Sequence, residues 1–308
     1  MKNASSPAPD APADYAAALS ALGHRFREPG VLAIEGPDCE AFLQGQLTQD
    51  TRGLAPGQSR PMAGLSPKGK LLYFGRLAAQ ADRLLLLVPA ADRVAIAGHL
   101  RKYAVFHKVS LSDVSGEFVL LGLYGPASGQ IQAPEGALAL PADGEFAAGL
   151  LAPAADRAAL EGLLERAGST AVSNHSAEIL RVETGRPRFG TDADEDNLPD
   201  EAGLQSAISS TKGCYVGQEV VARLRTYGRV NRRLTGFRFP EEAVPAGTVF
   251  SDPGKENLEL GRVTSSVVSP RFGPIGLGFT FRAVAEGGVL RLPADPGRCA
   301  VVAALPFA

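Results

Sequence analysis

Short apolar runs separated by turn residues dominate the first part of the chain. Residues 31–36 (VLAIEG) alternate weakly and end at Gly-Pro, a pattern typical of a strand followed by a turn. Asp38 is a suitable N-cap for the segment CEAFLQGQL, in which Phe42, Leu43 and Leu47 fall on one helical face. The pattern therefore predicts a strand followed by an amphipathic helix.

The next apolar runs extend this pattern and indicate the fold class. We expect strands at LLYFGRLAAQ and RLLLLVP, a helix over 90–103, and further strands over 105–111 and 117–123. The order strand, helix, two strands, helix, strand is a split βαβ arrangement. It predicts an α+β protein with a mainly antiparallel sheet.

The residue composition and apolar pattern change twice in the second half of the chain. A Gly/Ala/Pro-rich stretch suggests a break between two lobes near 112–150, and helices are expected over 153–168 and 176–184. From about residue 234, six short strand candidates are separated by Gly/Pro turns, which favours a small β-barrel or sandwich. The predicted organisation is a disordered tail over 1–24, a two-lobed region over 25–233 and a β domain over 234–308.

Composition excludes several classes of protein. The net charge of −2 gives no global attraction to DNA or to an anionic membrane. The three cysteines, Cys39, Cys214 and Cys299, are too few and too dispersed for a closed zinc site, an iron–sulfur site held by four cysteines or a disulfide framework. No metal site is therefore expected. The N-terminus lacks the pattern of a secretory signal or a mitochondrial presequence, and no apolar run reaches 18 residues. These features predict a soluble, cytoplasmic protein.

Residues 211–233 (TKGCYVGQEVVARLRTYGRVNRR) concentrate the candidate chemistry. Cys214 stands between Gly213 and Gly217, and Lys212 is expected to stabilise a thiolate there. Five arginines follow within eleven residues: Arg223, Arg225, Arg229, Arg232 and Arg233. The residues alone leave two interpretations open, a reactive thiol beside a cationic patch or a buried structural cysteine beside a solvated basic strand.

The segment KGCYVGQE resembles the signature of the YgfZ family, Lys-Gly-Cys-aromatic-x-Gly-Gln-Glu, at every fixed position. The resemblance continues into VVAR and RVNRRL, which are similar to the mitochondrial iron–sulfur assembly factor of that family. Upstream, FLQGQLTQD, SPKGKLL and LRKYAVFHKVSL are similar to family segments in the family's order, so the resemblance spans about residues 30–285.

This resemblance implies a fold and a function. The fold would be two mixed α/β lobes and a C-terminal β-barrel around a central cavity that holds tetrahydrofolate or a derivative, as in the related glycine-cleavage T-protein. The activity would be support for the assembly or repair of Fe–S clusters in client enzymes, including enzymes that modify tRNA, so that tRNA is only an indirect partner. Lys212 and Cys214 would carry the chemistry, and the folate-binding candidates would be Gly213, Gly217, Gln218, Glu219 and Arg223.

Glu183, in the segment ILRVETGRP, is a further folate-binding candidate. A carboxylate can accept two hydrogen bonds from the edge of a pterin, and RVETG is similar to the RLEAG stretch of the T-protein, whose glutamate contacts the pterin. The alternative is an exposed salt-bridge residue at a helix end. The acidic stretch 191–201 lacks the glycine of a calcium loop, so we expect a solvated loop that faces the arginine-rich segment.

Two other functions compete with Fe–S maintenance. A folate-dependent aminomethyltransferase needs a carboxylate at the reacting nitrogen, yet Tyr73 and Phe74 occupy the positions where the T-protein carries acids. A non-catalytic RNA-binding module would use the arginines, but no recognised RNA-binding motif or basic net charge supports it. The sequence favours Fe–S maintenance and leaves open whether a reaction is catalysed.

Overall fold

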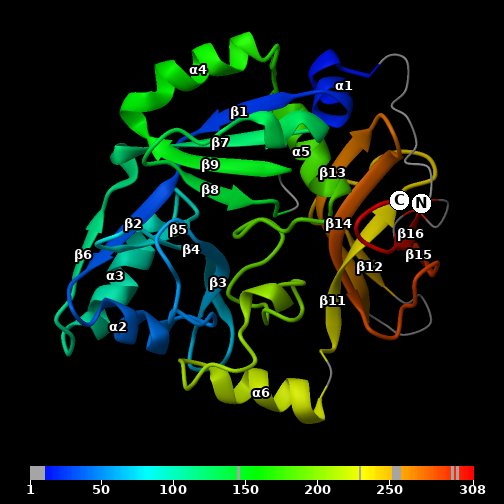
Figure 1. Ribbon diagram of the computed structural model, residues 1–308. Helices are drawn as coiled ribbons and strands as arrows, with labels where there is room; N and C mark the ends of the chain where they lie inside the picture. Colours follow the sequence, from blue (N-terminus) through cyan, green and yellow to red (C-terminus); the bar gives the residue numbers. More distant parts are fainter. Residues whose placement is uncertain (1–10, 144–145, 229, 252–257, 293–294, 296–297) are drawn as a thin grey trace.

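The computed structural model describes residues 11–143, 146–228, 230–251, 258–292, 295 and 298–308 (Figure 1). Two five-stranded sheets with helices form two lobes, and a six-stranded sheet forms a third body beside them. The predicted α+β class, with two mixed lobes and a C-terminal β-barrel, is confirmed. Residues 1–10 of the predicted tail lie outside the described residues.

The first lobe is an antiparallel sheet covered by two helices. Its strands, in spatial order, are β3 (Ser59–Leu65), β4 (Leu71–Ala79), β5 (Leu84–Val88), β2 (Gly30–Glu35) and β6 (Ser110–Asp113). Helices α2 (Cys39–Gln46) and α3 (Arg93–Ala104) bury Phe42 and Leu100 against its core. Strand β3 was not predicted, because Pro61 and Gly64 interrupt its apolar pattern. Gly64 is needed there, since an added Cβ would lie 2.3 Å from the ring of Tyr73 on β4.

The second lobe is built from strands that lie before and after those of the first lobe in the sequence. Its spatial order is β10 (Thr170–Ala171), β1 (Gly23–Arg27), β7 (Phe118–Tyr124), β9 (Ala148–Pro153) and β8 (Leu138–Pro141). The chain thus starts in this sheet, crosses to the first lobe at β2 and returns at β7. Helix α4 (Arg157–Arg166) covers one face of the sheet through Leu160 and Leu164.

The N-terminal stretch differs from the predicted tail. Residues Ala13–Ser20 form helix α1, and Tyr15 is completely buried together with Ala18. These side chains pack against Val172 and against Leu180 of helix α5 (Asn174–Glu183). The Pro/Ala-rich composition conceals this role, because two apolar residues suffice to anchor a short helix on an existing core.

The third body is a nearly closed antiparallel barrel. Its strands are β12 (Val249–Ser251), β13 (Glu259–Ser269), β14 (Gly273–Phe281), β11 (Arg232–Arg238), β16 (Cys299–Ala303) and β15 (Val289–Arg291), in spatial order. The edge strands β12 and β15 contact one another. Phe237, Phe250 and Val302 fill the interior. All six strand candidates in this region are confirmed.

A long connection with little regular structure joins the lobes to the barrel. It runs from residue 184 to residue 217 and leads into helix α6 (Gln218–Tyr227). Its acidic stretch faces the arginine-rich segment, as predicted: Asp200 pairs with Arg225 at 3.1 Å and Glu201 with Arg232 at 3.4 Å. The expectation of a solvated loop is wrong, because Asp192, Asn197 and Glu201 are buried. The remaining short elements are 3-10 turns at Ser115–Glu117, Pro126–Gln130, Ala154–Asp156 and Gln205–Ala207. No helix in the described part of the chain is both long and apolar enough to cross a membrane.

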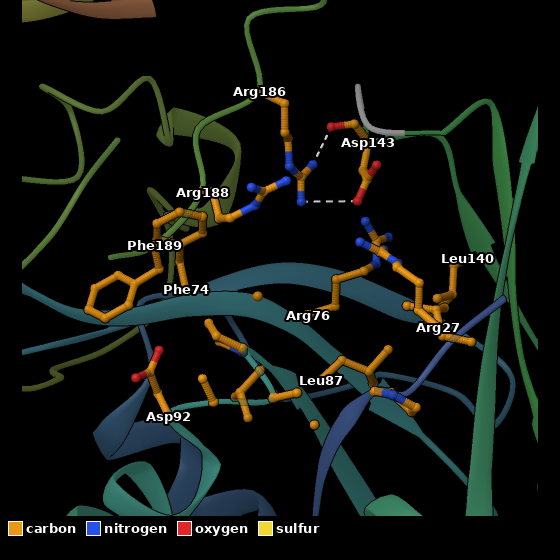
Figure 2. Close-up of a pocket in the computed structure, with 18 of the residues that line it drawn as sticks. Arg27, Phe74, Arg76, Leu87, Asp92, Leu140, Asp143, Arg186, Arg188 and Phe189 are labelled. Carbon is orange, nitrogen blue, oxygen red and sulfur yellow. Dashed lines mark hydrogen bonds and ion pairs between the residues drawn. The ribbon is translucent and has the colours of Figure 1, made fainter. Parts of the chain in front are cut away.

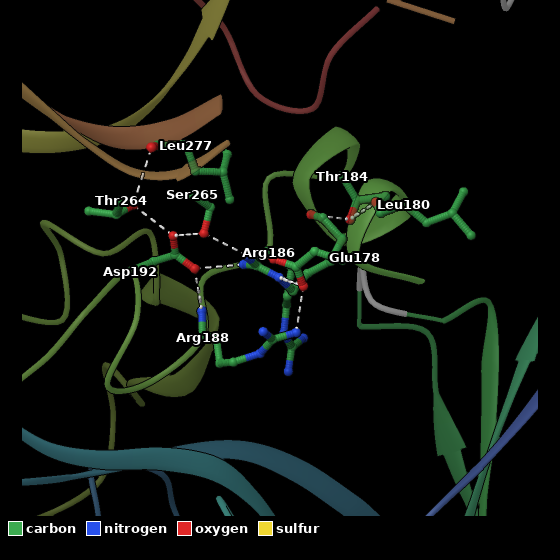
Figure 3. Close-up of polar contacts among 10 residues, drawn as sticks. Glu178, Leu180, Thr184, Arg186, Arg188, Asp192, Thr264, Ser265 and Leu277 are labelled. Atoms are coloured by element: carbon green, nitrogen blue, oxygen red, sulfur yellow. Dashed lines mark hydrogen bonds and ion pairs between the residues drawn. The ribbon is translucent and has the colours of Figure 1, made fainter. Parts of the chain in front are cut away.

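A buried ion pair fastens helix α5 to this connection and to the barrel. The Arg181 guanidinium lies 2.6 Å from a carboxylate oxygen of Asp192, and both side chains are almost completely buried. Arg181 also donates to Glu178 and to Ser265 of β13, each at 2.7 Å. Asp192 accepts from Ser265 and from Thr264, as Figure 3 shows. The pair therefore has the additional hydrogen bonds that a buried ion pair needs to offset desolvation.

Removing one partner of this pair should destabilise the whole protein. Arg181→Met leaves the Asp192 carboxylate buried without its counter-charge, so the free energy of unfolding should fall by about 3–5 kcal/mol. Chemical denaturation measures this change. Arg157→Gln, which breaks the exposed pair of Arg157 with Glu161, is the matched control and should cost at most about 0.5 kcal/mol. Equal effects of the two variants would show that the buried pair does not hold the bodies together.

Candidate functional site

A cavity of about 400 Å³ opens between the two lobes and the connection that follows helix α5. Its volume lies within the range typical of small-molecule sites. Figure 2 shows its principal lining residues, which come from five separate parts of the chain. They are Arg27, Phe74, Arg76, Leu87, Asp92, Leu140, Asp143, Arg186, Arg188 and Phe189.

One part of the cavity wall is aromatic. Phe74 of β4 and Phe189 of the connection meet edge to face, with 5.8 Å between ring centroids. Phe74 is almost fully buried, and alternation along β4 turns it away from Tyr73, which packs into the helical side of the sheet. This wall suits a flat aromatic ring, because aromatic rings bind one another through offset or edge contacts.

Another part of the wall is rich in guanidinium groups (Figure 2). Arg186 forms an ion pair of 3.0 Å with Asp143, and Arg188 lies 2.7 Å from the Glu178 carboxylate. Arg76 of β4 lines the same space and donates to Ser59 Oγ at 3.1 Å. An anionic group in the cavity would therefore meet several hydrogen-bond donors.

A smaller cavity of about 180 Å³ lies next to the first. The two share Phe74, Asp143 and Arg186 in their walls, and the smaller one extends to Ser206 and Ala207. The Arg186–Asp143 pair thus forms part of the wall of both cavities. Neither lining includes a described residue of the barrel, so the central hole expected between the lobes and the barrel stays a prediction.

The loop predicted to carry the chemistry begins at Lys212, shortly after the last residue that lines the smaller cavity in the sequence. Lys212 is buried, and its ammonium donates to the backbone carbonyls of Leu47 and Gln49 at 2.6 and 2.8 Å. Burial lowers the pKa of Lys212 to about 8, while the charge of Asp50 acts in the opposite direction. The lysine therefore ties the loop to the first lobe, and the expected effect on the Cys214 thiolate stays a prediction.

The two glycine-containing motifs of the sequence touch one another. Gly217 has a φ of +82° at the start of α6, and an added Cβ would lie 2.5 Å from the Ser66 carbonyl. Opposite it, Gly69 has a φ of +73°, and its Cβ would approach Val220 to 2.9 Å. The segments SPKGKLL and KGCYVGQE thus meet backbone to backbone, which gives a packing reason for Gly69 and Gly217.

Cys214 itself is exposed, as are Gly213, Glu219 and Arg223. Gln218 is half-buried at the beginning of α6. The buried structural cysteine is therefore excluded, and the thiol is accessible to a partner. None of the loop's predicted folate-binding residues lines the cavities described above. Arg229 lies outside the described residues.

Glu183 has a buried position at the end of helix α5. Its Oε1 accepts hydrogen bonds from Tyr15 and from Ser269 of β13, each at 2.5 Å, and its Oε2 lies 3.6 Å from Arg271. The carboxylate thus joins α1, α5 and the barrel. It does not line the described cavities, so its contact with a pterin stays a prediction.

Sequence reasoning missed the residues that shape the main cavity. Arg76, Asp143, Arg186 and Arg188 belong to no motif, and tertiary folding alone brings them together. The run RPRF at 186–189 was the available signal, because it places two arginines and an aromatic residue directly after a predicted helix end. Within the described residues, no cluster of His, Cys, Asp and Glu has a geometry that could hold a metal ion.

Comparisons with known proteins agree with this architecture. No family model matches the chain. A solved structure, the glycine cleavage system aminomethyltransferase T of Bartonella henselae, superposes with a TM-score of 0.82 over 96% of this chain and 88% of its own, at 23% identity. At that identity the likeness establishes the fold, which is therefore that of the T-protein.

Sequence relatives establish the family. A chloroplastic protein of Arabidopsis thaliana is 28% identical over 84% of this chain, and the chain spans 65% of that relative's length. The tRNA-modifying protein YgfZ of Edwardsiella ictaluri is 32% identical over 74% of this chain and 72% of its own. This similarity shows that the chain belongs to the YgfZ family.

Proposed function

We propose that this protein binds tetrahydrofolate, or a derivative, in the cavity between its lobes and supports the assembly or repair of Fe–S clusters in client enzymes. The observation that carries the proposal is the cavity, whose wall joins an aromatic pair to a group of arginines. A pteroylglutamate has a flat ring system and a carboxylate tail, so it presents both kinds of group that this wall can bind. When bound, the folate supplies the capacity to carry a one-carbon unit.

The residues present fit such a ligand. Phe74 and Phe189 are placed to hold a ring, and Arg76 and Arg186 to hold anionic groups. Arg76 has a buried Nε without a hydrogen-bond partner in the described structure, which is a donor in need of an acceptor. These contacts would bind and orient the ligand away from bulk water.

The exposed Cys214 is the proposed point of contact with client enzymes. A single thiolate cannot hold an Fe–S cluster, which normally needs four protein ligands. The Cys214 thiolate can coordinate one iron of a cluster transiently at the surface, where the contacts of Lys212 and Gly217 fix the loop. The relatives named tRNA-modifying proteins support clients among the enzymes that modify tRNA, with tRNA itself as an indirect partner.

The two positions where the T-protein carries acids hold no carboxylate in this chain. Phe74, which lines the cavity, has no group that can accept a proton. Tyr73 is buried beneath the sheet, and burial raises the pKa of its hydroxyl well above the ordinary value, so it stays protonated. Neither residue can do the work of a carboxylate at the reacting nitrogen.

Tetrahydrofolate should bind to the wild-type protein, and Phe189→Ala should weaken that binding about tenfold, the order of one lost aromatic contact. Isothermal titration measures the affinity. Phe106→Ala removes an aromatic side chain that is 89% exposed and does not line the cavity, and it is the matched control. A wild-type protein that binds no tetrahydrofolate, or a Phe189→Ala variant with unchanged affinity, would contradict the proposed site.

Purified protein should not transfer an aminomethyl group from a glycine-loaded lipoyl carrier to tetrahydrofolate, because the strand at Phe74 provides no carboxylate. A coupled assay for the methylene product checks this expectation. Turnover at the rate of an ordinary enzyme, about 1 per second or faster, would revive the aminomethyltransferase assignment.

Iodoacetamide should label Cys214 in the native protein before the half-buried Cys39 and Cys299. Mass spectrometry of the labelled peptides gives the order. Cys214→Ser should keep its folate affinity, because the thiol lies outside the cavity lining, but it should fail to restore Fe–S client activity in cells that lack the wild-type protein. A fully active Cys214→Ser variant would leave the cysteine without the proposed role.

A further inference from the structure

Arg76 is the one cavity arginine whose position is unexplained by contacts within the protein. Its side chain is 7% exposed, and its only described hydrogen bond joins Nη2 to Ser59 Oγ. The Nε atom is buried and has no hydrogen-bond partner among the described residues. No carboxylate in the described part of the chain lies within ion-pair distance of this guanidinium.

Without a ligand, this buried guanidinium reduces the stability of the folded protein. An arginine stays charged under all ordinary conditions, and a buried charge without a counter-charge loses its hydration without compensation. Burial and the charge of Arg186 lower the pKa of Arg76, and only Asp143 acts in the opposite direction. Asp143 is itself committed to Arg186 at 3.0 Å. The cavity wall thus retains a positive charge and a free donor.

The residues around Arg76 indicate which ligand could supply an acceptor for its unpaired donor. Figure 2 shows Arg27 beside Arg76 on one side of the cavity, while Phe74 and Phe189 lie on the other side. A ligand that satisfies both sides must carry a flat ring at one end and an anionic group at the other. A guanidinium matches a carboxylate or a phosphate through two parallel hydrogen bonds.

We propose that Arg76 forms the anion-binding subsite of the cavity and takes a carboxylate or phosphate group of a ligand whose ring lies against Phe74 and Phe189. This inference rests on the proposed function when the ligand is tetrahydrofolate, and the anionic group is then a carboxylate of the glutamate tail. It assigns the direction in which the ligand lies in the cavity and gives Arg76 a role in selecting ligands with an acidic tail.

The first test compares a ligand that has the tail with one that lacks it. Arg76→Gln should weaken tetrahydrofolate binding about 10- to 100-fold, the worth of a charge-assisted hydrogen bond, and leave the binding of 6-methyltetrahydropterin unchanged. Arg76→Lys should retain part of the affinity for tetrahydrofolate. Arg166→Gln removes an exposed arginine of α4 and should behave as wild type. Equal losses for the two ligands, or no loss, would overturn the inference.

A second measurement separates ligand binding from a structural role. Arg76→Met removes the unpaired buried charge, so without ligand its melting temperature should equal or exceed that of the wild type. Added tetrahydrofolate should raise the melting temperature of the wild type more than that of the variant. A variant that is strongly destabilised without ligand would show that Arg76 serves the fold, which contradicts the inference.

Inorganic phosphate distinguishes failure of this inference from failure of the proposed function. If the wild type binds no tetrahydrofolate but binds phosphate in an Arg76-dependent manner, the folate assignment fails and the anion subsite stands, for a ring-bearing phosphate ligand. If tetrahydrofolate binds and Arg76→Gln binds it equally well, the folate assignment stands and the subsite fails. A wild type that binds neither ligand overturns both.

Discussion

The Arg181–Asp192 ion pair is the interaction on which the rest of the structure depends. Its two side chains are almost completely removed from solvent, and it joins helix α5 to the connection after it and, through Ser265, to the barrel. Arg186 and Arg188, which line the cavity, lie between the two partners in the sequence. The pair therefore holds the part of the cavity wall between its two partners and joins helix α5 to the barrel. A hydrophobic contact could hold the bodies together, but it would not fix hydrogen-bond directions in this way.

The cavity and the exposed thiol are separate sites connected by one continuous segment. The connection walls the main cavity at Phe189 and the smaller cavity at Ser206, and it then continues to Lys212 and Cys214. Lys212 fastens its end to the first lobe through two backbone carbonyls. This architecture suits a protein in which small-molecule binding and contact with a client occur at different places.

The local sequence pattern predicts most of the helices and strands, but it does not predict the residues that line the cavity. The strands of the barrel and the helices near residues 39, 93, 157 and 174 follow from apolar periodicity and turn residues. Helix α1 and strand β3 were missed because tertiary contacts of Tyr15 and Gly64 decide them. The sequence left two interpretations of Cys214 open, and its exposure in the folded chain decides between them. Arg76 and Asp143 could not be predicted as neighbours, because β4 and the loop after β8 meet only when the lobes assemble.

The space between the lobes is the proposed binding site for a ring-bearing anion such as tetrahydrofolate. A crystal structure of the full chain soaked with tetrahydrofolate tests it most directly. We expect ligand density with its ring system against Phe74 and Phe189 and its carboxylate tail at Arg76. Density at another place, or an empty cavity at a concentration that saturates binding in solution, would contradict it.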